Sequence, residues 1–115
     1  MPTFDRADVV SVPFPYTDRP VRQRRPALVV SSPIYERQTG LLWIVMITAA
    51  ENRHWPGDVA LSNPGRAGLS IPSIVRPTKI ATIEAIQASR IGSIGEVERD
   101  SVYAELSKIL SVVGR

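Results

Sequence analysis

The basic side chains of this 115-residue chain are almost all arginine, and several cluster near its N-terminus. Twelve of the fourteen basic residues are arginines, and Arg19, Arg22, Arg24 and Arg25 lie within seven residues. The planar guanidinium group suits bidentate contact with phosphate better than the point charge of lysine does. The cluster has two interpretations: a solvated loop that keeps the protein soluble, or a contact for a polyanion, with nucleic acid as the leading candidate.

Few other side chains in the sequence are suited to catalysis. The chain has no cysteine, which excludes disulfides, zinc–thiolate sites, iron–sulfur clusters and cysteine nucleophiles. The single histidine, His54, lies in a polar stretch at 51–55, where it is either a solvated bystander or an acid–base group that titrates near neutral pH. Trp55 either stacks on a nucleobase or fills the mouth of a barrel. The carboxylates form no metal-ligand pattern, so we expect no metal and no other cofactor.

Short strands must position these side chains, because strand signals fill most of the chain before residue 95. The sequence predicts strands at 8–13, 27–31, 41–48, 58–61, 73–76, 79–86 and 88–94, the last as strand or turn. The run at 27–31 lacks polar alternation, so we expect both its faces to be buried. Pro77 is expected to end one strand, and 32–40 is interpreted as a turn or a short irregular helix. The pattern favours a small, strongly curved antiparallel sheet or barrel, because helices are too few for parallel crossovers.

An apolar stripe with helical spacing follows Gly95. Its members predict a helix of about four turns, and they are Val102, Leu106, Ile109, Leu110 and Val113. Gly114 stands where a glycine that caps the helix C-terminus belongs. We interpret this helix as a lid on the core of the sheet rather than as a partner-binding helix.

Size and composition predict one domain over residues 1–115. The chain is 43% hydrophobic and 22% charged, with a net charge of +3, as is ordinary for a globular protein. Its longest apolar run, 41–47, is far shorter than the roughly 20 residues needed to cross a bilayer. The N-terminal residues have no basic stretch followed by an apolar run. We therefore expect a soluble, cytoplasmic protein with no membrane contact.

Motifs spaced along the chain resemble those of one known family. The stretch 8–18, Asp-Val-Val-Ser-Val-Pro-Phe-Pro-Tyr-Thr-Asp, is followed at 24–31 by Arg-Arg-Pro-Ala-Leu-Val-Val-Ser. Later motifs occur in the family's order, and they are Ile47-Thr48, Gly68-Leu69, Pro72-Ser73-Ile74-Val75-Arg76, Lys79-Ile80, Thr82-Ile83 and Ile91-Gly92. Over residues 4–114 the chain resembles the MazF/PemK family, the toxin half of type II toxin–antitoxin pairs.

The resemblance implies a fold, an activity and partners. The expected fold is mainly β (α+β), a small SH3-like, CcdB/PemK-type antiparallel β-barrel with a C-terminal α-helix, acting as a homodimer. The implied activity is metal-independent, sequence-specific cleavage of single-stranded RNA, with messenger RNA as the expected target. The 2′-hydroxyl of the RNA is the implied nucleophile, and the products are 2′,3′-cyclic phosphate and 5′-hydroxyl ends. The implied partner is an antitoxin whose acidic, disordered C-terminal segment folds over the RNA groove.

The resemblance also implies roles for individual residues. The family's motif arginine falls on Arg25 and its catalytic threonine on Thr48, so these are the expected catalytic residues. Taken alone, each also has a structural interpretation, as an arginine paired with a carboxylate and as a strand-end threonine. Contacts with RNA are expected from Asp18, Arg22, Arg24, Arg53, His54, Arg76, Thr78 and Lys79.

Some positions depart from the family's pattern. Pro20 stands where some members carry a glutamate, and Asp18 lies close enough in the sequence to substitute for it. Thr78-Lys79 stands where a carboxylate followed by glutamine is common. Arg76 matches an arginine that is catalytic in some members.

Two other functions stay open at this stage. One is a toxin of the CcdB branch, which shares the fold and poisons DNA gyrase through protein contacts. The other is a catalytically silent module that binds RNA or an antitoxin. Arg25 and Thr48 in their motifs favour the nuclease, because poisoning gyrase requires neither residue.

Overall fold

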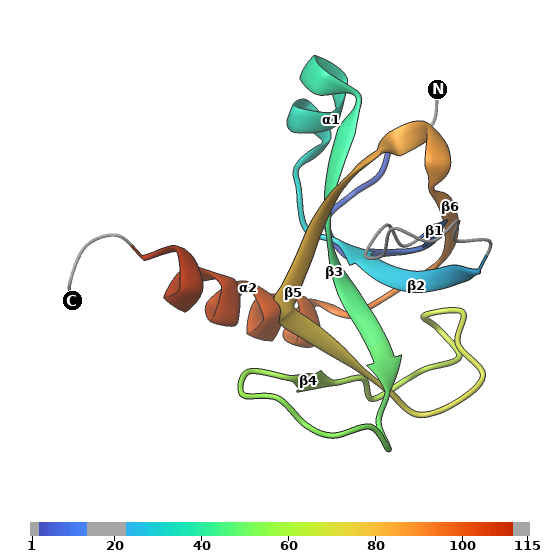
Figure 1. Ribbon diagram of the computed structural model, residues 1–115, viewed down its shortest axis with the longest axis vertical. Helices are drawn as coiled ribbons and strands as arrows, with labels where there is room; N and C mark the ends of the chain where they lie inside the picture. The colour runs from blue at the N-terminus through green and yellow to red at the C-terminus, as the bar shows by residue number, and fades with distance from the viewer. Residues whose placement is uncertain (1–2, 14–22, 112–115) are drawn as a thin grey trace.

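Six strands, two α-helices and one short 3-10 helix make up the part of the chain that the computed structural model describes, residues 3–13 and 23–111 (Figure 1). In chain order they are β1 (Asp8–Pro13), β2 (Arg24–Val29), α1 (Pro33–Thr39), β3 (Leu41–Ala49), β4 (Val59–Ala60), β5 (Ser73–Glu84), η1 (Ala85–Gln87), β6 (Ser89–Ser93) and α2 (Glu96–Leu110). The described strands form one sheet in the order β4-β5-β3-β2-β1-β6, with antiparallel neighbours throughout. The sheet curls into a half-barrel with a helix after it, which confirms the predicted mainly β fold class.

Alternate residues of the central strands face opposite sides of the sheet, and both sides are covered. Val9 of β1 belongs to one apolar cluster and its neighbour Val10 to the other, and Leu28 and Val29 of β2 divide in the same way. Helix α2 packs on the first cluster, whereas Phe4 packs on the second. Burial of both faces explains why these strands are continuous apolar runs. It confirms the predicted burial of the strand at 27–31, although β2 begins three residues earlier and ends two residues earlier than predicted.

Strand β5 is a single strand of 12 residues, whereas the sequence predicted two strands separated by Pro77. On β3, Val45 lies opposite Ile80, but the next residue, Met46, lies opposite Arg76. The β5 residues between these pairs, Pro77 among them, therefore bulge out of the ladder. Proline has no N–H to donate, so a bulge is one of the few places where a strand tolerates it. The prediction that Pro77 ends the strand is wrong for this reason.

Helix α1 is regular, although the sequence suggested a turn or an irregular helix at 32–40. The hydroxyl of Ser32 accepts a hydrogen bond from the Tyr35 N–H, and Pro33 occupies the first turn, as is favoured at helix N-termini. Gly40 ends the helix at φ 72°, and its N–H donates to the Glu36 carbonyl. Neither α-helix in the described ranges is long and apolar enough to cross a membrane.

Helix α2 only partly acts as the predicted lid. Val102 and Leu106 are buried in the first apolar cluster. Ile109 and Leu110, which belong to the same predicted stripe, are 55% and 58% exposed because the last turn extends away from the sheet (Figure 1). Val113 and Gly114 lie outside the described residues.

Two glycines allow the loop at 61–72, before β5, to pack closely against β6. Gly68 has φ 79°, and a Cβ atom there would lie 2.1 Å from the Ile91 carbonyl oxygen. A Cβ atom at Gly92 would lie 2.3 Å from the Ala67 carbonyl carbon. The Ser93 N–H also donates to the Arg66 carbonyl across this contact. The backbone of the loop therefore approaches β6 more closely than any other residue type at 68 or 92 would permit.

Gly68→Ala is expected to lower the free energy of unfolding by about 2–3 kcal/mol, because it combines a disfavoured positive φ with overpacking against backbone. Denaturation in urea measures the change. Gly65→Ala is the matched control, since its Cβ would meet only the Asn63 side chain, at 3.6 Å. Equal losses in the two variants would contradict the close-packing argument.

Candidate functional site

The pairing of β2 with β3 brings Arg25 and Thr48 to one pocket. The ladder between the two strands ends with Ala27 opposite Met46, and Arg25 and Thr48 each lie two residues beyond that pair, at the same end of the ladder. Both residues line a pocket of about 490 Å³. Other segments complete its walls through Asn52, Gly68, Leu69, Ser70, Ile71 and Ile91.

Arg25 presents an uncommitted charge to this pocket. Its backbone is held in β2, opposite Val12 of β1, while its side chain is exposed. Within the described residues, its guanidinium group makes no hydrogen bond or ion pair. A fixed backbone and a guanidinium group without a protein partner are suited to receive an anion.

The neighbouring arginine is committed to the fold. Arg24 donates from Nε to the Ser11 hydroxyl at 3.0 Å and from Nη2 to the Gln87 carbonyl at 2.8 Å. It also donates to the Ser11 carbonyl. Arg24 lines the pocket as well, but its hydrogen bonds tie β1 and β2 to the segment before β6.

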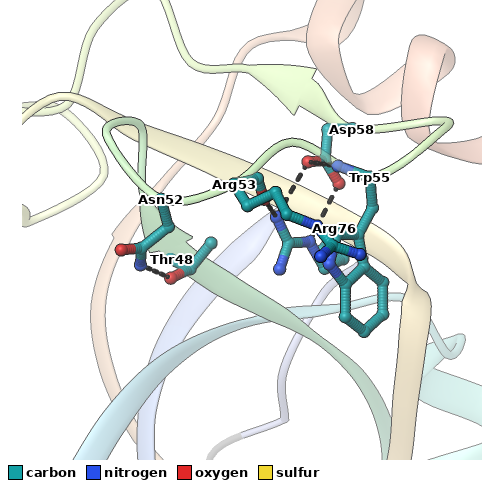
Figure 2. A network of polar contacts seen from close by, with 6 residues as sticks. All are labelled: Thr48, Asn52, Arg53, Trp55, Asp58 and Arg76. Carbon is teal, nitrogen blue, oxygen red and sulfur yellow. Dashed lines mark hydrogen bonds and ion pairs between the residues drawn. The ribbon is translucent and has the colours of Figure 1, made fainter.

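Thr48 has its hydroxyl oxygen engaged by an amide that the sequence analysis did not select. The Asn52 Nδ2 group donates to Thr48 Oγ1 at 2.7 Å (Figure 2). The Asn52 N–H donates to the Ala49 carbonyl, so a turn after β3 folds the amide back toward the end of the strand. Asparagine favours such turns, and its position four residues after Thr48 is the signal that sequence reasoning missed.

A buried ion pair, here named the Asp58–Arg76 clamp, holds the loop that carries Asn52. Arg76 donates from Nε to Asp58 Oδ1 at 3.1 Å and from Nη2 to Oδ2 at 3.0 Å. The side chains are only 7% and 5% exposed. Arg76 Nη2 also donates to the Arg53 carbonyl at 2.7 Å (Figure 2). The clamp therefore joins β5 to the loop at 50–57.

Trp55 packs on the clamp. The Arg76 guanidinium carbon lies 4.4 Å from the centre of the Trp55 ring, and Lys79 Nζ lies 5.6 Å from it. The Trp55 N–H donates to Asp58 Oδ2 at 2.9 Å. These contacts give the indole a packing role in the loop, and they leave Arg76 surrounded by protein groups.

Asp58 is ionised in this setting at neutral pH. Burial opposes its ionisation, but the hydrogen bonds from Arg76 and Trp55 and the Arg76 charge outweigh burial and lower the Asp58 pKa. A carboxylate paired in this way keeps the positive charge of Arg76 compensated inside the fold.

The other predicted RNA contacts lie outside the pocket or outside the described residues. Arg53 and His54 are exposed on the loop at 50–57, and Thr78 and Lys79 lie in the bulge of β5. Asp18 and Arg22 fall outside the described ranges. Across residues 3–13 and 23–111, no three or more His, Asp or Glu side chains gather in a way that would hold a metal ion.

Known proteins resemble this chain in sequence pattern and in fold. Residues 5–110 match the model of PemK-like, MazF-like toxins of type II toxin–antitoxin systems. No curated protein sequence matches significantly.

Solved structures share the fold at low identity. A chain from the crystal structure of MazE–MazF from Deinococcus radiodurans superposes with a TM-score of 0.77 and 22% identity, over 98% of this chain and 100% of that one. A chain from an endoribonuclease in complex with its cognate antitoxin, from a mycobacterial species, superposes with a TM-score of 0.73 and 20% identity, over 96% of this chain and 98% of that one. The toxin MazF-mt6 of Mycobacterium tuberculosis superposes with a TM-score of 0.72 and 15% identity, over 93% of this chain and 99% of that one. With the family model matched over nearly the whole chain, this protein belongs to the PemK-like, MazF-like toxins of type II toxin–antitoxin systems.

Proposed function

We propose that this toxin is a metal-independent endoribonuclease that cleaves single-stranded RNA at specific sequences. The observation that carries the proposal is the pocket that Arg25 and Thr48 both line, where the guanidinium group has no hydrogen-bond or ion-pair partner among the described residues and the other group is a hydroxyl. Membership of the toxin family supports the same activity.

The proposed reaction is a transesterification within the RNA. The 2′-oxygen forms a bond to the adjacent phosphorus while the bond from phosphorus to the 5′-oxygen breaks. The 2′-hydroxyl loses its proton, and the leaving 5′-oxygen gains one. The products are a 2′,3′-cyclic phosphate and a 5′-hydroxyl. Charge accumulates on the phosphoryl oxygens in the transition state, where positioned donors are most effective.

The pocket is suited to stabilising that charge. Arg25 supplies a positive charge and a fork of donors that matches two phosphoryl oxygens. Thr48 supplies a hydroxyl donor. No histidine or carboxylate of the described residues lines this pocket. We therefore assign Arg25 and Thr48 to phosphate binding and charge stabilisation.

We further propose that the chain acts in the cytoplasm as a homodimer of one-domain subunits and is inhibited by a cognate antitoxin. The related structures of MazE–MazF and of an endoribonuclease with its cognate antitoxin support this partner. An acidic segment is expected to bind over the Arg25 pocket, because the charge that receives phosphate also receives carboxylates.

A cleavage assay on long single-stranded RNA with EDTA present tests the proposal. The wild-type protein is expected to cut at specific positions and to leave cyclic phosphate ends. A single 2′-deoxy substitution at a cut position is expected to abolish that cut. Thr48→Ala is expected to slow cleavage about 10²-fold, which is the usual loss for one transition-state donor.

The opposite outcome is equally informative. A folded wild-type protein that cuts none of several RNAs would refute the nuclease proposal. Inhibition of DNA supercoiling by gyrase would then indicate a toxin of the CcdB type.

A further inference from the structure

We propose that Asn52 is a positioning residue for Thr48, which directs the Thr48 hydroxyl hydrogen toward a phosphoryl oxygen in the pocket. The inference rests on the proposed nuclease function and extends it to a residue that touches no reacting atom. It follows from the direction of one hydrogen bond, from Asn52 Nδ2 to Thr48 Oγ1 at 2.7 Å (Figure 2).

The donors and acceptors of the two groups explain the effect. A threonine hydroxyl has one hydrogen to donate and two lone pairs with which to accept. The Asn52 amide occupies one lone pair, so the Thr48 hydrogen is not used in this contact and stays available to the pocket. Within the described residues, the Thr48 hydroxyl donates to no protein group. An acceptor in place of the amide would reverse the bond and withdraw the Thr48 hydrogen from the pocket.

Hydrogen bonds on both sides of Asn52 hold it in place. On one side, the Asn52 N–H donates to the Ala49 carbonyl at 3.1 Å. On the other side, the carbonyl of Arg53 accepts from Arg76, which the clamp keeps buried (Figure 2). The exposed Asn52 side chain therefore extends from a fixed backbone. Such support is what keeps a reacting group in its productive geometry.

A direct contact between Asn52 and RNA is the competing explanation, because Asn52 itself lines the pocket. The two explanations differ in their dependence on Thr48. A positioning residue loses its effect when the group that it positions is removed, whereas a direct contact does not.

The test is a double-mutant cycle under single-turnover conditions, on an RNA with one cut site. The variants are Asn52→Ala, which removes the amide, and Asn52→Asp, which keeps its shape but only accepts at neutral pH. We expect maximal cleavage rates to fall about 10-fold for Asn52→Ala and about 10²-fold for Asn52→Asp, within the range for transition-state donors. In the Thr48→Ala background, we expect Asn52→Ala to change the rate less than about 2-fold, because interacting residues are not additive. Asn52→Asp is expected to keep only the part of its loss that comes from repulsion between its carboxylate and the RNA phosphate.

Two controls accompany the cycle. Asn63→Asp makes the same change of charge on another loop, where the asparagine accepts from the Arg66 N–H through Oδ1, and it is expected to leave the rate unchanged. The RNA concentration at half-maximal rate is expected to stay within about 2-fold in Asn52→Ala, because only a transition-state interaction is lost.

The outcomes distinguish failure of the Asn52 positioning role from failure of the proposed nuclease activity. Equal losses from Asn52→Ala with and without Thr48, or a loss in RNA affinity alone, would overturn the positioning role and leave the nuclease intact. Unchanged rates in both Asn52 variants would do the same. A wild-type protein that cleaves no RNA would overturn both proposals together.

Discussion

Replacing Arg25 with alanine is expected to lower the rate of RNA cleavage by about 10²–10³-fold, the loss typical of removing one charge-stabilising donor. The guanidinium group makes no hydrogen bond or ion pair within the described residues, so its removal leaves none of those residues without a partner. The free energy of unfolding is therefore expected to change by less than about 0.5 kcal/mol. Single-turnover cleavage and urea denaturation measure the two quantities separately.

Two companion variants sharpen this expectation. Arg25→Lys retains the charge but loses the two-pronged geometry, so we expect a rate between those of the wild type and Arg25→Ala. Arg24→Ala removes hydrogen bonds to Ser11 and Gln87 and is expected to act mainly on stability. A larger catalytic loss in Arg24→Ala than in Arg25→Ala would contradict the assignment of Arg25.

Replacing Asp58 with alanine is expected to cost about 3–5 kcal/mol of folding free energy, because it leaves the buried Arg76 charge without its partner. The Arg76 side chain is 7% exposed, and its guanidinium group packs on the Trp55 ring. Urea denaturation gives the free-energy difference. Asp100→Ala, which removes an ion-pair partner that is 71% exposed, is the control and is expected to cost less than about 1 kcal/mol.

The stabilisation by Asp58 depends on pH with a definite sign. Its pKa is lowered in the folded state, so its contribution is fully present above the unfolded-state value of about 3.9 and is lost as the pH falls through the lowered pKa. Wild type and Asp58→Ala are therefore expected to converge in stability on acidification below about pH 4. A difference that stayed constant down to pH 2 would contradict the ion-pair explanation.

The strands with both faces buried were the most predictable part of the fold. β1 and β3 match the predicted ranges closely, because β-branched and aromatic residues fill both faces. The sequence could not predict that β5 is one continuous strand, because the bulge that accommodates Pro77 depends on the register with β3. The exposed end of α2 was missed for a similar reason, since spacing marks an apolar face without showing how far the sheet extends beneath it.

In the candidate site too, some residues were predictable from the sequence and others were not. Arg25 and Thr48 were selected through their motifs, and the antiparallel pairing of β2 with β3 brings the strand ends that carry them to one pocket. The burial of Arg76 was not visible in the sequence, because its partner Asp58 lies 18 residues away on another segment. Asn52 was missed because its relation to Thr48 is a side-chain contact within a turn, which composition does not reveal.

The closure of β6 onto β1 has a consequence for the order in which the protein is made. These strands pair across most of the chain, and Asp8 and Arg90, which form an ion pair at 2.6 Å, are 82 residues apart. Contacts of such long range form slowly, and synthesis delivers the N-terminal strands first. A nascent chain that already contains Arg25 and Thr48 still lacks β6, the strand against which the Gly68 loop docks. The pocket therefore lacks one of its walls until β6, which begins at Ser89, has been synthesised, well after both Arg25 and Thr48.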